Sequence, residues 1–198
     1  MMTATLFGTS AVRIRCDAPP SAALSQSLAA LADDLAARPG VLDVAIGYTE
    51  VVAYTAGHEQ ALQLQAQPIS LPAAPACRPQ EHVIHVDYCG EDLGWVARQC
   101  GLSEAEIVRR HSAASYTVAM IGFQPHFPYL HGLDATLHVP RRDNPRSCVR
   151  AGAVAMAAGQ AGIYPCDTPG GWHVLGYCDP ALCVPINAGD RVIFRPAP

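Results

Sequence analysis

A stretch rich in proline and alanine divides this chain of 198 residues into two parts. Four prolines fall within residues 66–80, at positions 68, 72, 75 and 79. Proline lacks a backbone N–H and fixes φ, so such a run supports neither a helix nor a central strand. We therefore expect an extended connector over residues 66–80 that joins one folded region to another.

Residues 1–65, before the connector, have the pattern of a small α+β lobe. Apolar and polar residues alternate in the strand-like stretches, and leucines recur at helical spacing between them. The expected elements are a strand over residues 12–16, a helix from a cap at Ser21 to a stop at Pro39, two strands over residues 42–54 and a short helix over residues 58–65.

A different rhythm follows the connector, in residues 81–198. Alternation over residues 82–88 predicts a strand. Two helices are expected, over residues 93–100 and 103–111, and the second starts with a Ser-x-x-Glu capping box. From Tyr116 onward, short apolar runs are broken by glycine and proline, which is typical of a closed or nearly closed β-barrel. The expected fold class is α+β, a small N-terminal lobe followed by a β-barrel domain.

The composition argues against several classes of partner. Charged residues make up 15% of the chain and the net charge is −4, which gives no basis for binding nucleic acid or an anionic membrane. No apolar run reaches the length of a membrane span, and the N-terminal residues lack the pattern of a secretion signal. The eight cysteines form no C-x-x-C pair, so we expect reduced thiols in a cytoplasmic protein.

The most unusual stretch is GFQPHFPYL, residues 122–130, in which prolines flank aromatic residues. The prolines stiffen the backbone, so a rigid and exposed loop is expected. In the alternative interpretation, Phe123 and Phe127 plug the end of the barrel and have only a packing role.

Three arginines follow closely, in Pro140-Arg141-Arg142 and Pro145-Arg146. Their guanidinium groups repel each other unless an anion or an acidic partner sits between them. A phosphate or carboxylate site would need such convergence. A solvated basic turn is the other interpretation.

Glycines are dense over residues 159–172, where GQAGIYP is followed by TPGGW. Glycine lets backbone N–H groups approach a ligand closely. Gln160, Tyr164 and Thr168 offer neutral hydrogen bonds that suit an amide or a lactam. The stretch is not a phosphate-binding P-loop, because no Gly-Lys-Ser/Thr follows. Tight turns between barrel strands are the other interpretation.

The histidines do not have the spacing of a metal site. His126, His131 and His138 match no motif for zinc or iron, and we expect no metal held by this chain. His111 closes a predicted helix, where a cation would interact favourably with the helix dipole.

In sequence order these stretches resemble the B subunit of bacterial 5-oxoprolinase. The resemblance runs from Phe7-Gly8 to Pro196 and rests on His111-Ser112, GFQPHFPYL, PRRDNPR, GQAGIYP, TPGGW and the tail GDRVIFRP. The same family includes the sporulation-kinase inhibitor KipI and proteins described as allophanate hydrolase subunit 1. The resemblance implies a small α+β lobe followed by a cyclophilin-like β-barrel.

The resemblance also implies an activity and partners. The B subunit works with a direct partner, the KipA-like C subunit, and with the A subunit to open the lactam 5-oxoproline to glutamate at the expense of ATP. We expect ATP and Mg²⁺ to be shared with or supplied by the partner, and this chain to be inactive alone. Two alternatives stay open: a carboxyltransferase-type subunit of a urea-carboxylase-like system, and a KipI-like inhibitor of a histidine kinase.

The three motifs supply the expected site residues. Arg141, Arg142 and Arg146 are expected to contact a phosphate or carboxylate. Gln160 and Tyr164 are expected to hydrogen-bond the lactam. The remaining candidates for substrate or phosphate binding are Tyr129, Thr168, Gly170 and Gly171.

Proton transfer is expected from His111 or His126. His126 stands where the family usually has glycine, which suggests that this position needs a positive φ or leaves room for a ligand. Ala161 replaces a threonine of the family pattern, and His173 replaces a glutamine.

Overall fold

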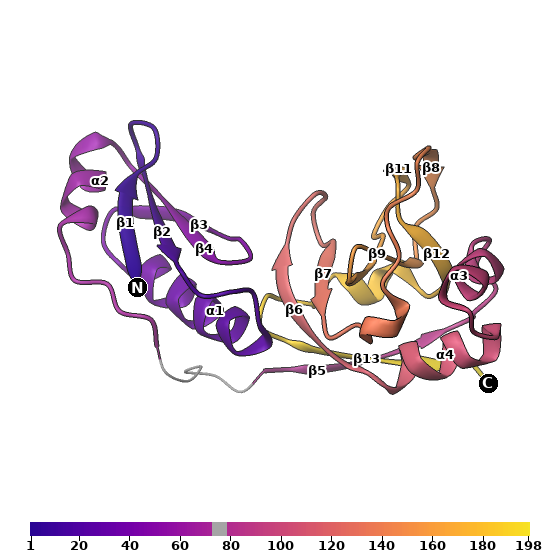
Figure 1. Ribbon diagram of the computed structural model, residues 1–198. Coiled ribbons are helices and arrows are strands. Elements are labelled where there is room, and N and C mark those ends of the chain that lie inside the picture. Colours follow the sequence, from indigo (N-terminus) through magenta and orange to yellow (C-terminus); the bar gives the residue numbers. More distant parts are fainter. Residues whose placement is uncertain (73–78) are drawn as a thin grey trace. The chain divides into compact units, whose positions relative to one another are not determined.

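The computed structural model describes residues 1–72 and 79–198 of the chain. The chain divides into two compact units, Met1–Pro79 and Gln80–Pro198 (Figure 1). The boundary falls at the end of the predicted connector, of which residues 73–78 lie outside the described part. Ile69 and Leu71 pack against the core of the first unit. The first unit therefore extends past residue 65 into the connector.

The first unit is a four-stranded antiparallel sheet with two helices packed on it. Its elements are β1 (Met2–Leu6), β2 (Ala11–Cys16), α1 (Ala22–Ala36), β3 (Val41–Ile46), β4 (Glu50–Thr55) and α2 (His58–Gln65), with strand order β1-β2-β4-β3. Ser21 caps α1, because its hydroxyl oxygen accepts a hydrogen bond from the Leu24 N–H at 3.2 Å. The elements predicted here are confirmed, and β1 is an additional strand.

Strand β3 differs from its predicted pattern at Leu42. Simple alternation would bury Leu42 with Val44 and Ile46, but Leu42 is 72% exposed. The pairing with β4 shifts register between Val41 and Asp43. This bulge turns Leu42 outward and lets Val41 pack against the core instead.

The second unit contains a seven-stranded sheet in the order β12-β9-β10-β7-β6-β13-β5. Its elements are β5 (Glu81–Val86), α3 (Leu93–Cys100), α4 (Glu104–Ala113), β6 (Ser115–Ile121), β7 (Pro128–His131), η1 (Ala135–Leu137), β8 (Arg146–Val149), β9 (Ala153–Ala157), β10 (Gln160–Ile163), β11 (Thr168–Gly170), β12 (His173–Tyr177), η2 (Pro180–Cys183) and β13 (Arg191–Pro196). Strands β8 and β11 form a separate two-stranded sheet. The predicted strand near residue 84 and both predicted helices are confirmed.

The seven-stranded sheet is nearly closed into a barrel. Beyond the end of β5, Asp87 exchanges two backbone hydrogen bonds of 2.9 Å with Tyr177 at the end of β12. The Gly90 N–H donates to the Leu175 carbonyl at 3.0 Å, and the Asp92 N–H donates to the Val174 carbonyl at 3.1 Å. The two ends of the sheet therefore meet, and the predicted class, α+β with a β-barrel domain, is confirmed.

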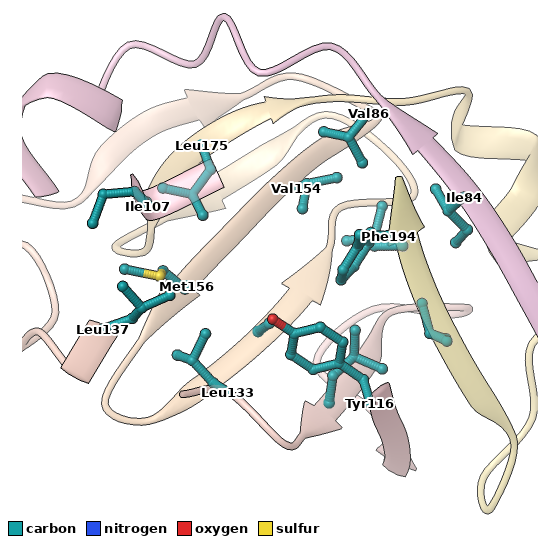
Figure 2. Close-up of a cluster of buried hydrophobic side chains, with 14 of the residues drawn as sticks. Ile84, Val86, Ile107, Tyr116, Leu133, Leu137, Val154, Met156, Leu175 and Phe194 are labelled. Atoms are coloured by element: carbon teal, nitrogen blue, oxygen red, sulfur yellow. The ribbon is translucent and has the colours of Figure 1, made fainter. Parts of the chain in front are cut away.

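Strand β9 separates two groups of buried side chains. Val154 and Met156 point into the larger group, where Figure 2 shows them with Tyr116 and Phe194. The other three residues of β9, Ala153, Ala155 and Ala157, point the opposite way. They belong to a second group that contains Phe127, Tyr164 and Trp172. Because both faces of β9 are covered, the strand is buried throughout. Alanine on one face leaves room for large aromatic rings beside it.

Among the described residues, no helix is long and apolar enough to cross a membrane. The seven cysteines outside residues 73–78 are all free thiols.

Candidate functional site: an aromatic pocket with one arginine

The loop between β6 and β7 is a tight turn with an unusual backbone. The Gly122 N–H donates to the Phe127 carbonyl at 3.1 Å, and the Phe127 N–H donates to the Gln124 carbonyl at 3.1 Å. Phe123 and His126 adopt positive φ values of 68° and 65°, which are uncommon for residues other than glycine. The positive φ suggested for position 126 is therefore present, although the residue is histidine.

The two phenylalanines of this turn differ in burial. Phe127 is 2% exposed and packs in the second core group, whereas Phe123 is 54% exposed. The ring of Phe127 lies 5.1 Å from that of Tyr164 and 5.7 Å from that of Trp172, both nearly perpendicular to it. Edge-to-face contacts of this kind fix aromatic rings in defined orientations. One phenylalanine anchors the loop and the other remains at the surface.

A pocket of about 100 Å³, open to solvent, lies among these rings. Its lining combines aromatic residues from β7, β10 and β12 and their loops with glycines next to β11: Phe123, Phe127, Tyr129, Arg141, Tyr164, Pro169, Gly170, Gly171 and Trp172. Five of the predicted site residues are therefore brought together here, namely Tyr129, Arg141, Tyr164, Gly170 and Gly171.

Of the two glycines of the lining, Gly170 allows close packing against an aromatic ring. A Cβ atom on Gly170 would collide with the hydroxyl of Tyr164. The carbonyl of Gly171 accepts a hydrogen bond of 2.8 Å from the Arg142 N–H. The glycine-rich stretch and the arginine-rich stretch are thus joined through their backbones at the pocket.

The three arginines of the predicted anion site do not converge on one empty space. Two of them, Arg142 and Arg146, pair instead with the carboxylate of Asp92, which lies 50 and 54 positions earlier in the sequence. Its side chain is 5% exposed and accepts a hydrogen bond of 2.6 Å from Arg142 and two, of 2.7 and 2.9 Å, from Arg146. The Val174 N–H also donates to Asp92 at 2.8 Å. Only Arg141 of the three lines the pocket.

The contacts of Asp92 stabilise its charged form. Burial alone would raise the pKa of this carboxyl, but the hydrogen bonds from Arg146 and the Val174 N–H, together with the two positive charges, lower it below its usual range. Asp92 is therefore an anion at neutral pH that pairs with both Arg142 and Arg146 and offsets one of their two positive charges.

Two predicted neutral hydrogen-bonding residues lie outside the pocket lining. Thr168 is buried and its hydroxyl accepts a hydrogen bond of 3.3 Å from the Gln124 side chain, which ties β11 to the aromatic loop. Gln160 opens β10 and pairs there with Ala157 of β9. Of the residues predicted to contact a lactam, only Tyr164 reaches the pocket.

His111 lies in the barrel core and does not line the pocket. It is fully buried, its ring stacks on Phe194 with centroids 4.7 Å apart, and its Nδ1 lies 2.7 Å from the Tyr88 hydroxyl. Burial lowers the pKa of His111 to about 3. The histidine is therefore neutral at physiological pH and does not make the cationic interaction with the helix dipole that its position allows; its role in proton transfer stays a prediction.

The other histidines are placed as follows. His126 is exposed at the turn and is not part of the lining. His173, which replaces the family glutamine, is buried; its Nε2–H donates to the Pro140 carbonyl at 2.9 Å and its ring stacks on Trp95 at 4.1 Å. Within the described residues, no group of three or more His, Cys, Asp or Glu side chains is arranged to hold a metal ion.

Several residues of this site are not predicted by the sequence. In the sequence, Trp172 is only the last residue of a motif, and its contact with Phe127 joins the residues just before β12 and β7, two strands that are not neighbours in the sheet. The role of Asp92 as an ion-pair partner is not visible in the neighbouring sequence, because an aspartate at the start of a helix is common. The one available clue is that three neighbouring arginines require an acidic partner.

The sequence match places this two-unit chain in a class of carboxyltransferase domains. The family model described as carboxyltransferase domain, subdomain C and D, matches residues 2–188, so the chain belongs to this family. Within the family it falls among proteins named as the B subunit of 5-oxoprolinase. It is 35% identical to the one from Escherichia coli O157:H7 over 205 residues, which cover 96% of this chain and 94% of that protein.

Solved structures share the fold of this chain. The crystal structure of TTHA0988 is similar with a TM-score of 0.82 and 34% sequence identity over 96% of this chain. This chain spans only 40% of the length of TTHA0988. The Kluyveromyces lactis urea carboxylase shares the fold, with a TM-score of 0.72 and 15% identity, and this chain covers 22% of it.

Proposed function

We propose that this chain is one component of an ATP-dependent 5-oxoprolinase, which opens 5-oxoproline to glutamate together with the C and A subunits. The observation that carries the proposal is the near full-length similarity to the B subunit of 5-oxoprolinase from Escherichia coli O157:H7. The pocket supports it, because aromatic walls and a single guanidinium suit a small ring with a polar substituent.

The chemistry explains why such an enzyme would use ATP and several subunits. An unstrained lactam is hard to hydrolyse at neutral pH, and phosphorylation of its oxygen would create a leaving group. Mg²⁺ bound to ATP is held mainly by carboxylates and phosphate oxygens. Among the described residues that line the pocket, none carries a carboxylate. We therefore assign the nucleotide and Mg²⁺ to a partner subunit, and this chain to binding and orienting the substrate.

A second candidate is a carboxyltransferase-type subunit of a urea-carboxylase-like system. It is favoured by the description of the matching family and by the shared fold of the urea carboxylase. The chain contains no lysine, so the biotin that such a system needs would have to be carried by another protein. A KipI-like inhibitor of a histidine kinase stays a further alternative without a specific observation in its favour.

Reconstitution separates the first two candidates. The purified chain is mixed with the C and A subunits, and glutamate release is measured with ATP and 5-oxoproline. The same mixture is then given carboxybiotin and urea. Glutamate release that requires ATP supports the 5-oxoprolinase, whereas carboxyl transfer to urea without glutamate release supports the alternative.

A further inference from the structure

We propose that the pocket binds a small flat ring bearing a carboxylate, with the ring against the aromatic walls and the carboxylate paired with Arg141. The proposal rests on the proposed function, because 5-oxoproline is such a molecule. It goes further in assigning the orientation of the ligand and the residue that recognises its charge.

The ion pairs beside the pocket distinguish Arg141 from the other two arginines. Asp92 lies between Arg142 and Arg146 and forms an ion pair with each. Across residues 1–72 and 79–198, no side-chain hydrogen bond or ion pair engages Arg141, which is exposed and lines the pocket. An arginine without an acidic partner is available for bidentate pairing with a carboxylate.

The neighbouring hydroxyl groups do not neutralise Arg141. Burial raises the pKa of Tyr129 and of Tyr164, and the nearby Arg141 lowers each pKa by less than burial raises it. Both tyrosines are therefore protonated and neutral at physiological pH. The pocket carries a net positive charge, which favours an anionic ligand and disfavours a free amine.

The walls determine the shape of the ligand. The rings of Phe127, Tyr129 and Trp172 lie 4.9 to 5.7 Å from one another, and their tilted contacts leave them fixed. Phe123 forms an exposed wall of the same pocket. Flat apolar surfaces pack well against such faces, and a pocket of about 100 Å³ that is open to solvent limits the ligand to a small molecule. A five-membered lactam is flat and small enough to enter.

The backbone contacts of the arginine stretch keep Arg141 in place. The next residue, Arg142, is held at its N–H by the Gly171 carbonyl and at its side chain by Asp92. Arg141 is thus presented by a fixed segment, which reduces the cost of ordering it when the ligand binds.

Binding to the full-length chain tests this assignment. Dissociation constants of L-5-oxoproline and of 2-pyrrolidinone, the same ring without the carboxylate, are measured by ligand-observed NMR. L-5-Oxoproline is expected to bind about tenfold to hundredfold more tightly, since a hydrogen-bonded pair of charges accounts for such a factor. Arg141→Met should remove this difference and leave the affinity for 2-pyrrolidinone unchanged.

Arg150→Met is the matched control, because Arg150 is also exposed but lies over the ring of Tyr177, outside the lining. It should keep the difference between the two ligands. Equal affinities in the unaltered chain, no binding of either ring, or a difference that survives Arg141→Met would each overturn the proposal.

The assay distinguishes this proposal from the proposed function. If the three-subunit mixture forms glutamate and Arg141→Met leaves the KM for 5-oxoproline unchanged, the orientation is wrong and the function stands. If the mixture forms no glutamate but binding of the ring depends on Arg141 as described, the function is wrong and the pocket assignment stands.

Discussion

Asp92 is the residue on which the arrangement beside the pocket depends. Its carboxylate joins the start of α3, the arginine stretch and β12 through four hydrogen bonds. Removal of a buried anion that two cations share is strongly destabilising, because both cations lose their partner.

We expect Asp92→Asn to lower the free energy of unfolding by about 2–4 kcal/mol, since Arg142 and Arg146 are partly exposed and can recover some hydration. Chemical denaturation at pH 7 measures the loss. Glu91→Gln is the matched control: Glu91 is exposed and accepts one hydrogen bond from Tyr177, so its change should be smaller than about 1 kcal/mol. Equal losses in both variants would contradict the role of Asp92.

The stability that the Asp92 ion pairs contribute falls in acid. The pKa of Asp92 is lower in the folded chain than its ordinary value of about 3.9. Its stabilising contribution is therefore complete at neutral pH, and it is lost as the pH falls below that value and through the lower folded pKa.

His111 makes a second contribution to acid sensitivity at a higher pH. Its folded pKa of about 3 lies below the ordinary value of 6.5, so the unfolded chain takes up a proton that the folded chain does not. Stability is lost as the pH falls below 6.5, by about 2 kcal/mol at pH 5 for this one group.

Replacing both His111 and Tyr88 by phenylalanine removes this proton uptake together with the hydrogen bond between the two side chains, so neither loses its partner. Between pH 7 and pH 5, the double variant should lose about 2 kcal/mol less stability than the unaltered chain. Denaturant midpoints at both pH values measure this. Tyr88→Phe alone serves as the control, because it keeps His111 and should therefore keep the original pH dependence.

At the scale of elements, the barrel depends on the seam between the segment after β5 and strand β12. Gly176 lies in this seam, where a Cβ atom would collide with the Asp87 carbonyl and come within 2.9 Å of the Tyr88 Cα. The neighbouring atoms belong to backbone and cannot turn aside.

We therefore expect Gly176→Ala to cost about 2–3 kcal/mol of stability and to speed hydrogen exchange at the Asp87 and Gly90 amides. Gly171→Ala is the control, because its nearest neighbouring atom would lie 3.6 Å away. It should change stability by less than about 0.5 kcal/mol. Unchanged exchange in Gly176→Ala would show that the barrel does not depend on this seam.

Elements with a strong local pattern could be predicted from the sequence, and their pairing could not. The helical spacing of the leucines in α1 and the alternation in β5 can be recognised within a short stretch of sequence. The bulge at Leu42 and the contact between Asp87 and Tyr177 arise from pairing across the sheet, which leaves no local pattern.

The same distinction holds for the candidate site. The motif that contains Tyr164 and the glycines next to β11 is identifiable, because glycine and aromatic residues gather there in the sequence. The pairing of Asp92 with Arg142 is not, because the two residues are 50 positions apart. His111 has the sequence position of a helix-terminal cation, and only its burial shows that it is neutral.

At the scale of the whole molecule, the names of the relatives, which are subunits of 5-oxoprolinase, support the proposal that the chain is one component of an enzyme. In our proposal the pocket recognises a small ring, and the described lining carries no carboxylate, so we assign the magnesium–nucleotide site to a partner subunit. The family match covers both units of the chain, residues 2–188, so both belong to the family's domain.

The most direct test measures glutamate formed from 5-oxoproline and ATP while this chain is titrated into fixed amounts of the C and A subunits. We expect no glutamate without the chain, a rate that rises until the chain saturates its partners, and no glutamate from the chain alone. Glutamate formed at the same rate without the chain, or by the chain without its partners, would contradict the proposed role.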